Sequence, residues 1–192
     1  MTSEGPAALA VGLLSDVIDR LLSPDRSKLS RDELLDLTRA FEGQARRLPT
    51  IEHHLVAEID SRKLAAELRY RDTAALLSQL LMLTRRQAGD RVADASELGP
   101  RKALSGEVLP PQFPAAAAAL AEGSITAAHA AVIRKTVHEL PHPTRAEHAQ
   151  SIDRTLTEHA VAMDTRTLAI VAQRVVATLH PDGDEVTDRI HR

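Results

Sequence analysis

The chain has 192 residues, with 24 Lys and Arg against 27 Asp and Glu, and a formal net charge of −3 at pH 7. Hydrophobic residues make up 43% and charged residues 27% of the sequence, which excludes wholesale disorder and indicates a folded globular protein. Cysteine is absent, which excludes disulfides, thiolate metal sites and cysteine nucleophiles. Aromatic residues make up only 2%, and an aliphatic core favours close-packed helices over sheets.

The apolar N-terminal stretch, residues 7–14, does not have the features of a secretory signal. Glu4 stands where a signal would carry Lys or Arg, and Asp16 and Asp19 soon interrupt the apolar run. No other run approaches the ~18 apolar residues that a membrane span requires. We therefore expect an amphipathic helix over residues 7–22, no membrane partner and a cytoplasmic protein.

Long helices are predicted next, over residues 30–68. The first begins with a capping box made by Ser30 and Glu33 and carries apolar residues at three- and four-residue spacing. Pro49 interrupts the backbone hydrogen bonding, so it either kinks one long helix or occupies the first turn of another that continues to Leu68. Long antiparallel helices of this kind form the frame of a helix bundle.

Residues 69–96 are predicted to form a helix-turn-helix-like hairpin. A helix over residues 72–82 is followed by a short break and by a second helix over residues 84–96. The second helix begins with a capping box in which Thr84 and Gln87 satisfy each other's backbone N–H groups.

The residue types around the predicted turn suit a helix-turn-helix unit. Ser78 supplies a small residue, and the apolar positions are filled by Leu77, Leu81, Leu83 and Ala88. Two positions depart from the pattern: Met82 stands at the turn position that usually holds glycine, and Arg91 falls on a late core position. Arg85 and Arg86 lie in the first turn of the second helix, where such proteins place side chains that contact bases and phosphates.

Charge is unevenly distributed along the chain. Residues 62–102 contain nine basic against five acidic side chains, whereas residues 1–61 contain seven against eleven and residues 103–192 eight against eleven. A polyanion would be attracted to the centre and repelled by the flanks. The alternative is a solvated basic hairpin, because charge runs often mark only a hydrated face. The candidate DNA-binding residues are Arg69, Arg71, Arg85, Arg86, Gln87, Arg91, Arg101 and Lys102.

The C-terminal half is also predicted to be helical. Residues 99–114 are non-periodic and rich in Pro and Gly, which indicates a loop. A short helix then opens at Pro114 and ends at Gly123, and its alanine run is assigned to close packing. Three further helices are predicted over residues 125–140, 144–162 and 164–179.

The expected fold class is all-α, a multi-helix bundle of about nine helices that contains the helix-turn-helix-like hairpin. Residues 115–180 are expected to pack on the first part of the chain and to form one continuous domain with it. The predicted divisions are a helical bundle over 1–98, the loop over 99–114, the helical part over 115–180 and a polar tail over 181–192.

The sequence offers no catalytic or metal-binding pattern. The chain contains nine histidines, but His138 and His142 are separated by a proline and His53 and His54 are adjacent, so neither pair has ligand spacing. Neither a Gly-x-Ser-x-Gly motif nor a phosphate-binding glycine loop is present. We therefore expect no catalytic residue, no metal and no cofactor in this chain.

Four groups of residues recur in the order and spacing of a known family. They are Tyr70, Thr73, Ala74, Ala75 and Leu77; Leu83, Thr84, Arg85 and Ala88; Ala119, Leu120, Ala121, Gly123, Ile125, His129 and Ala130; and Pro181, Asp182 and Gly183. With these residues the chain resembles the actinobacterial 13E12 repeat family over about residues 30–183. It departs from the family at Arg69 and Met82, where glycine is expected, and at Leu76, where an aromatic residue is common.

The resemblance implies a helical domain of unknown function that commonly precedes an HNH endonuclease module, and hence an association with DNA. An HNH centre needs His and Asn, and this chain contains no asparagine. We expect any nuclease to follow Arg192, so that this chain is itself non-catalytic.

Two hypotheses follow from the sequence. The first is a helical module that binds or positions double-stranded DNA through the basic hairpin. The second is an interaction scaffold without direct DNA contact, in which the leucine-rich helices over residues 7–22 and 30–68 form a homodimer seam. The two hypotheses are compatible, because many helix-turn-helix proteins bind DNA as dimers.

Overall fold

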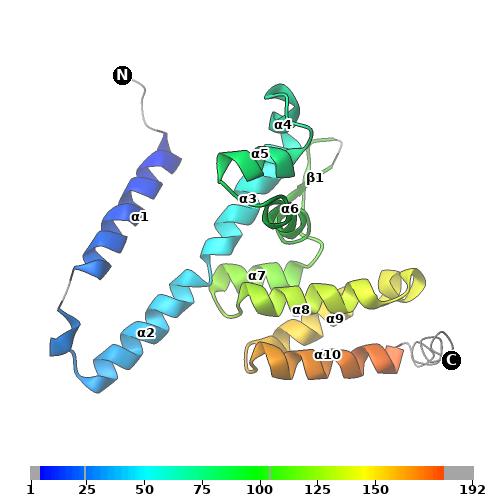
Figure 1. The fold of residues 1–192 in the computed structure, drawn as a ribbon. Helices are drawn as coiled ribbons and strands as arrows, with labels where there is room; N and C mark the ends of the chain where they lie inside the picture. Colours follow the sequence, from blue (N-terminus) through cyan, green and yellow to red (C-terminus); the bar gives the residue numbers. More distant parts are fainter. Residues whose placement is uncertain (1–4, 24, 104, 180–192) are drawn as a thin grey trace. The chain divides into compact units, whose positions relative to one another are not determined.

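The structure, a computed structural model, describes residues 5–23, 25–103 and 105–179, and it confirms the all-α fold (Figure 1). Within these residues there are ten α-helices, of which α4 has only four residues, one 3-10 helix and one pair of two-residue strands. The chain divides into two compact units, residues 1–41 and 42–192. The predicted polar tail and the Pro181, Asp182 and Gly183 motif lie outside the described residues.

The first unit contains α1 (Pro6–Leu22), the 3-10 helix η1 (Arg26–Lys28) and most of α2 (Arg31–Ala45). The predicted capping box starts α2: the Ser30 N–H donates to the Glu33 carboxylate at 2.8 Å, and the Glu33 N–H donates to the Ser30 hydroxyl at 3.3 Å. No residue of α1 or α2 is buried. The sequence therefore predicts these helices well, yet their apolar faces meet no core.

The predicted helix that continues to Leu68 is broken. Pro49 lies in the first turn of α3 (Leu48–Ser61), so it starts a new helix, as one of the two alternatives proposed. Beyond α3, Lys63 has a φ of 56° and interrupts the chain before the single turn of α4 (Leu64–Glu67). A left-handed residue cannot continue an α-helix, and Lys gives no sequence signal for that conformation.

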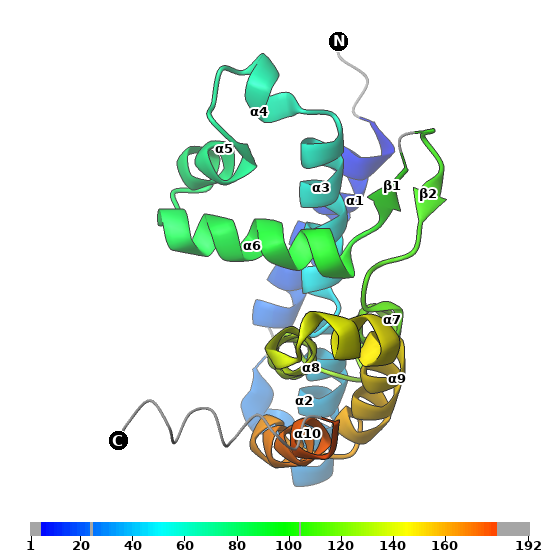
Figure 2. The ribbon, with the colours of Figure 1, turned by 90° about the vertical axis from the view of Figure 1, so that its right-hand side faces the viewer.

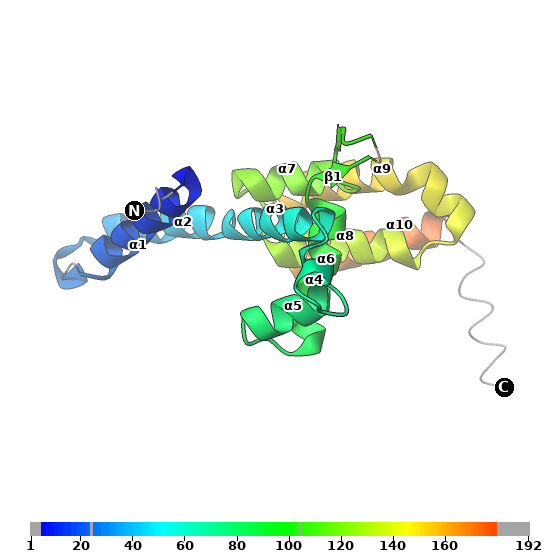
Figure 3. The same ribbon diagram turned by 90° about the horizontal axis from the view of Figure 1, so that it is seen from above.

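The helices α3 to α6 and a β-hairpin form the first part of the second unit. In Figure 2 and Figure 3, α5 (Thr73–Leu80) and the strands β1 (Arg101–Lys102) and β2 (Val108–Leu109) lie on opposite sides of α3. α6 (Arg85–Leu98) packs on both α3 and α5. The small core between these helices consists of Val56, Leu77, Ala88 and Ala95.

The β-hairpin lies inside the stretch that was predicted to be a loop. The strands are antiparallel, with Arg101 opposite Leu109 and Lys102 opposite Val108. Gly106 adopts a φ of 87° in the turn between them. Strands of two residues are too short to show an alternating pattern, which explains why the sequence did not indicate them.

The last four helices enclose the main core, and Figure 1 shows them stacked together. They are α7 (Pro114–Glu122), α8 (Ala127–Glu139), α9 (His142–Ala160) and α10 (Thr165–Leu179). The alanine run of α7 is used for packing as predicted, since Ala116 and Ala119 are buried. The start predicted at residue 144 for α9 is wrong, because Pro143 occupies the first turn of a helix that begins at His142. The largest fully buried apolar side chains here are Leu120, Ile125, Ile133, Leu140, Leu156 and Leu168.

Two glycines meet where the end of α2 approaches the end of α7. Gly123 caps α7 with a φ of 78°, as predicted for a C-terminal glycine. A Cβ atom at this position would lie 2.2 Å from the Gly43 carbonyl oxygen. Nearby, the Arg47 side chain donates a hydrogen bond to the Ala121 carbonyl at 2.9 Å. Only glycine fits position 123 without moving the backbone.

Candidate nucleic-acid interface

The helix-turn-helix-like hairpin is present, and a left-handed residue shapes its turn. Met82 has a φ of 56°. The Leu83 N–H donates to the Ser78 carbonyl at 2.9 Å, and the Ser78 hydroxyl donates to the Leu83 carbonyl at 2.7 Å. The capping box of Thr84 and Gln87 then starts α6, as predicted. The turn therefore has the conformation that glycine would adopt most easily, although the residue is methionine.

Arg69 shows the same behaviour at the entrance to the hairpin. Its φ is 62°, and it is the second position at which the resemblance expects glycine. At both positions where glycine is expected, this chain thus has a left-handed backbone that glycine would adopt most easily. In place of glycine, position 69 carries a basic side chain and position 82 an apolar one. The Met82 side chain is 90% exposed.

Asp72, at the start of α5, forms hydrogen bonds with two of the candidate arginines. Its carboxylate caps α5 by accepting the Ala75 N–H at 2.7 Å. Arg85, the first residue of α6, donates two hydrogen bonds to the same carboxylate, both at 2.9 Å, and Arg71 donates one at 3.0 Å. Hydrogen bonds from Arg85, then from the Ala75 N–H and Arg71, hold the pKa of Asp72 well below its usual range. The same contact with Asp72 raises the pKa of Arg85.

Arg69 and Arg86 extend this group. Arg86 follows Arg85 in the first turn of α6, and Arg69 lies two residues before Arg71. Both side chains are exposed, and neither makes a hydrogen bond or ion pair with any described residue. We call this group the Asp72 cluster: Asp72, Arg69, Arg71, Arg85 and Arg86.

The structure does not bring the other candidate residues to the Asp72 cluster. Arg91 pairs with Glu52 of α3, and Lys102 donates to the Glu58 carboxylate at 2.7 Å. The Arg101 side chain donates to the Pro110 carbonyl at 2.8 Å. Gln87 is engaged in its capping box.

The acidic helix α3 explains why these basic side chains are neutralised. Residues 48–98, which include α3 and the packed hairpin, contain seven basic and eight acidic side chains. The excess of basic side chains over residues 62–102 was counted without the carboxylates of α3, because α3 precedes residue 62 in the sequence. In the folded chain α3 packs beside α6, so its carboxylates reach these basic side chains. At Glu58, hydrogen bonds from Lys102 and then Arg62 lower the pKa to about 2.

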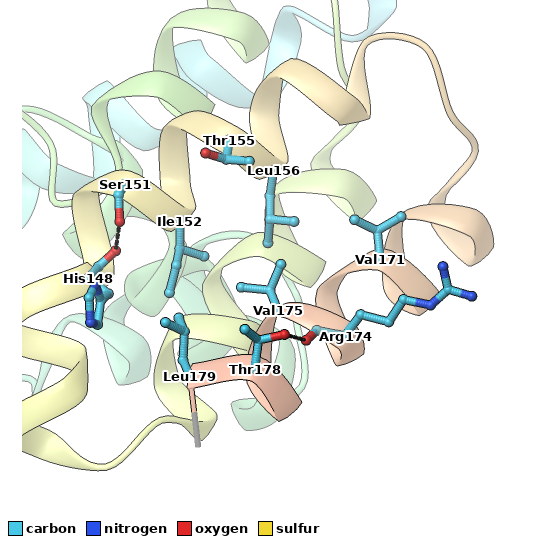
Figure 4. Close-up of a pocket in the computed structure, with 10 residues that line it drawn as sticks. All are labelled: His148, Ser151, Ile152, Thr155, Leu156, Val171, Arg174, Val175, Thr178 and Leu179. Carbon is cyan, nitrogen blue, oxygen red and sulfur yellow. Dashed lines mark hydrogen bonds between the residues drawn. The ribbon is translucent and has the colours of Figure 1, made fainter. Parts of the chain in front are cut away.

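The groove between α9 and α10 carries no comparable group of charges. Its volume is about 340 Å³, and Ile152, Leu156, Val171 and Val175 form part of its lining (Figure 4). Two of the hydroxyl groups in it bond to their own helices: Ser151 donates to the His148 carbonyl and Thr178 to the Arg174 carbonyl. The lining is therefore mainly apolar and offers few free polar groups to a ligand.

His129, one of the residues that carry the family resemblance, has a structural role. Its Nδ1 atom accepts the Thr126 N–H at 3.2 Å, which closes a capping box at the start of α8. Its Nε2 atom lies 2.9 Å from the Met163 carbonyl, an acceptor, so the proton resides on Nε2. Sequence reasoning missed this cap, because a capping box is normally recognised by Glu or Gln at the third position.

Asp153 is a buried residue that sequence reasoning also missed. Its side chain is in α9, and it accepts the backbone N–H groups of Ala115 and Ala116 at 2.8 and 3.1 Å. Burial raises the pKa of Asp153, and the hydrogen bonds oppose this shift. No sequence signal marks an aspartate that caps a different helix 38 residues away.

In the part of the chain that the structure describes, no group of three His, Asp or Glu side chains could hold a metal ion. None of the described helices combines the length and the apolar character needed to cross a membrane.

A family model and several curated relatives match this chain. The profile described as "Domain of unknown function (DUF222)" matches residues 35–192. An uncharacterized protein of Mycobacterium tuberculosis H37Rv, Rv1128c, is 35% identical over 175 residues, which cover 91% of this chain and 39% of that protein. A second uncharacterized protein of that strain, Rv1702cMb1728c, is 31% identical over 196 residues, covering 100% of this chain and 42% of its own length.

The chain thus spans about two fifths of the length of these relatives. No solved structure matches it. Because the profile covers most of the chain and the relatives cover nearly all of it, this protein belongs to the DUF222 family, which is also called the 13E12 repeat family.

Proposed function

We propose that the chain is a helical module that binds or positions double-stranded DNA, with Arg69, Arg71, Arg85 and Arg86 on the phosphates. The observation that supports this proposal is the Asp72 cluster. Asp72 caps α5 and binds two exposed arginines, Arg71 and Arg85, the second of which is the first residue of α6. The exposed Arg69 and Arg86 lie within two residues of these arginines along the chain.

The ion pairs of the cluster leave its arginines available to a polyanion. Asp72 and Arg85 have side chains that are 40% and 45% exposed. Exposed ion pairs of this kind contribute only about 0–1 kcal/mol, so a phosphate can replace the carboxylate at little cost. The N-termini of α5 and α6 also favour anions.

This proposal is narrower than the prediction from the sequence. Arg91 and Lys102 are paired with carboxylates of α3, and Arg101 is bound to a backbone carbonyl. We therefore leave these three out of the contact set and expect about two to four phosphate contacts.

A salt titration tests the proposal. The logarithm of the affinity for duplex DNA should fall with the logarithm of salt concentration with a slope of about −2 to −4. Replacing Arg69 and Arg86 together by Ala should weaken binding about tenfold and reduce the slope by about one to two. The control is Arg154→Ala, an exposed arginine of α9.

Equal effects of Arg154→Ala and of the double replacement would contradict the proposed site. A duplex affinity that does not depend on salt would contradict binding through phosphate contacts.

The link to an HNH nuclease and the cytoplasmic location are further parts of the proposal. The relatives are more than twice as long as the chain, which leaves room for a catalytic module in proteins of this kind. In such a protein this chain would hold the duplex and the nuclease module would cut it. A cleavage assay that compares a full-length relative with and without its DUF222 region would test this division of labour.

A further inference from the structure

The first unit of the chain carries a large apolar surface and has no core. No residue of α1 or α2 is buried. Among the described residues, twelve of the 22 exposed large hydrophobic side chains lie in this unit. The twelve are Leu9, Val11, Leu13, Leu14, Val17, Ile18, Leu21, Leu22, Leu34, Leu35, Leu37 and Phe41.

The apolar face of α1 is too wide for contact with a single neighbouring helix. At 3.6 residues per turn, the nine residues 7, 10, 11, 13, 14, 17, 18, 21 and 22 fill one half of the helix circumference without a polar interruption. A helix that packs on one surface usually has an apolar stripe of about 100°. A half-circumference face requires neighbours on more than one side, as in the interior of a helix bundle.

The unit cannot be stable in this form without a partner. It has 41 residues, and the chain contains no cysteine. Units of about this size usually need disulfides, metals or oligomerisation, and isolated helices of 15–17 residues are marginal in water.

We propose that residues 6–41 of two copies of the chain associate into a four-helix bundle, with α1 and α2 of each copy burying their apolar faces. This homodimer goes beyond the proposed DNA function and does not depend on it. A symmetric dimer places the same surface of each copy in contact, and two helical hairpins supply the four faces that a bundle core needs.

The available area suits a dimer. Burying one large aliphatic side chain removes about 60–120 Å² of apolar surface from water. Leu9 lies on the polar half of α1, and the other eleven side chains are about half exposed, so they offer on the order of 500 Å² of apolar surface per copy. Homodimer interfaces are about 65% apolar, so this area corresponds to about 800 Å² per partner, the standard size of a stable interface.

The charges of the unit disfavour a membrane surface as the alternative occupant. Helices that lie on anionic membranes carry Lys and Arg on their polar faces. The polar face of α1 carries Asp16 and Asp19 against Arg20 alone, and residues 31–41 of α2 carry Asp32, Glu33 and Asp36 against two arginines.

Sedimentation of the full chain without DNA tests the dimer. The wild-type protein should sediment at twice the chain mass at micromolar concentration. Leu14→Asp, at the centre of the apolar half of α1, should raise the dissociation constant at least about a hundredfold, because each dimer would bury two unpaired carboxylates. Leu9→Asp is the matched control, since Leu9 lies on the polar half, beside Asp16, and should change the dissociation constant less than about threefold.

Circular dichroism of both variants should show the thermal transition of the α7–α10 core unchanged, which separates lost association from lost folding. A wild-type monomer at every concentration would overturn the proposal, whether the apolar faces then meet the rest of the chain, a lipid surface or another protein. Equal dissociation constants for Leu14→Asp and Leu9→Asp would overturn it as well.

Discussion

Asp153 and Asp72 perform the same local task in two regions with different roles. Each carboxylate caps the start of a helix, Asp153 that of α7 and Asp72 that of α5. Asp153 is 1% exposed, whereas the Asp72 side chain is 40% exposed and shares its charge with arginines. Their pKa values accordingly shift in opposite directions, upward at Asp153 through burial and downward at Asp72 through Arg85. The comparison teaches that the buried carboxylate in α7–α10 stabilises the fold, whereas the exposed charges at the start of α5 and α6 remain accessible to a ligand.

The largest effect is expected at the buried cap. Asp153→Ala should lower the free energy of unfolding by about 3–4 kcal/mol, because two backbone N–H groups lose their acceptor inside the protein. Asp164→Ala is the matched control at an exposed cap, where Asp164 accepts the Thr167 N–H at 2.8 Å, and it should lower the free energy of unfolding much less. Urea unfolding measures both. Equal losses would show that burial does not set the importance of Asp153.

The second largest effect is expected for Gly123→Ala, which should lower the free energy of unfolding by about 2–3 kcal/mol. The new Cβ atom would be 2.2 Å from the Gly43 carbonyl oxygen, and alanine is strained at a φ of 78°. The control is Gly106→Ala, where φ is 87° but no atom lies within 4 Å of the new Cβ. We expect about 1 kcal/mol there, from strain alone. A thermal unfolding series in which both variants behave alike would contradict the close approach of α2 and α7.

Much of the fold could be predicted from the sequence because its signals are local. The capping boxes at Ser30 and Thr84 and the glycine cap at Gly123 each act within a few residues, and the structure confirms all three. The alanine run of α7 was likewise assigned correctly to packing, since small side chains permit close helix approach.

Features that depend on distant segments could not be predicted. Lys63 and Arg69 adopt left-handed conformations that neither residue type announces. Arg91 and Lys102 pair with carboxylates of α3 because α3 packs beside them in the folded chain. A count of charges along the sequence carries no information about that packing. For the candidate site, the sequence therefore shows the stretch in which the basic residues lie. Which of them form ion pairs with α3 and which stay exposed near Asp72 is decided only by the folded structure.

Met82→Gly should stabilise the protein by about 0.5–1 kcal/mol. Glycine relieves the strain of a φ of 56° at the hairpin turn, partly offset by the greater freedom it gives the unfolded chain. Met82 is 90% exposed, so little packing is lost. The same replacement at the exposed Leu80, the last residue of α5, should instead lower the stability, by up to about 1 kcal/mol. A loss of thermal stability for Met82→Gly would mean that the methionine side chain stabilises the turn.

The pH dependence of stability should differ in sign between the two aspartates. Asp153 has a raised pKa, so wild type should lose stability relative to Asp153→Asn as pH rises above about 3.9, the value in the unfolded chain. Asp72 and Glu58 have lowered pKa values, so their contributions are present above about pH 4 and are lost as pH falls through those values, about 2 for Glu58. Urea midpoints measured across this pH range check both signs. The difference between wild type and Asp153→Asn reports the effect of Asp153, and the fall of the Asp153→Asn midpoint at low pH reports the effects of Asp72 and Glu58.

The most direct measurement of the proposed function is the duplex DNA affinity of Asp72→Asn at low salt. Asparagine caps a helix as well as aspartate does, and the lost ion pairs are exposed, so the stability of the fold should be nearly unchanged. Removal of the carboxylate frees Arg71 and Arg85 for phosphates, and the account predicts a three- to tenfold higher affinity, about 0.7–1.4 kcal/mol. An unchanged or lower affinity in a folded variant would contradict it.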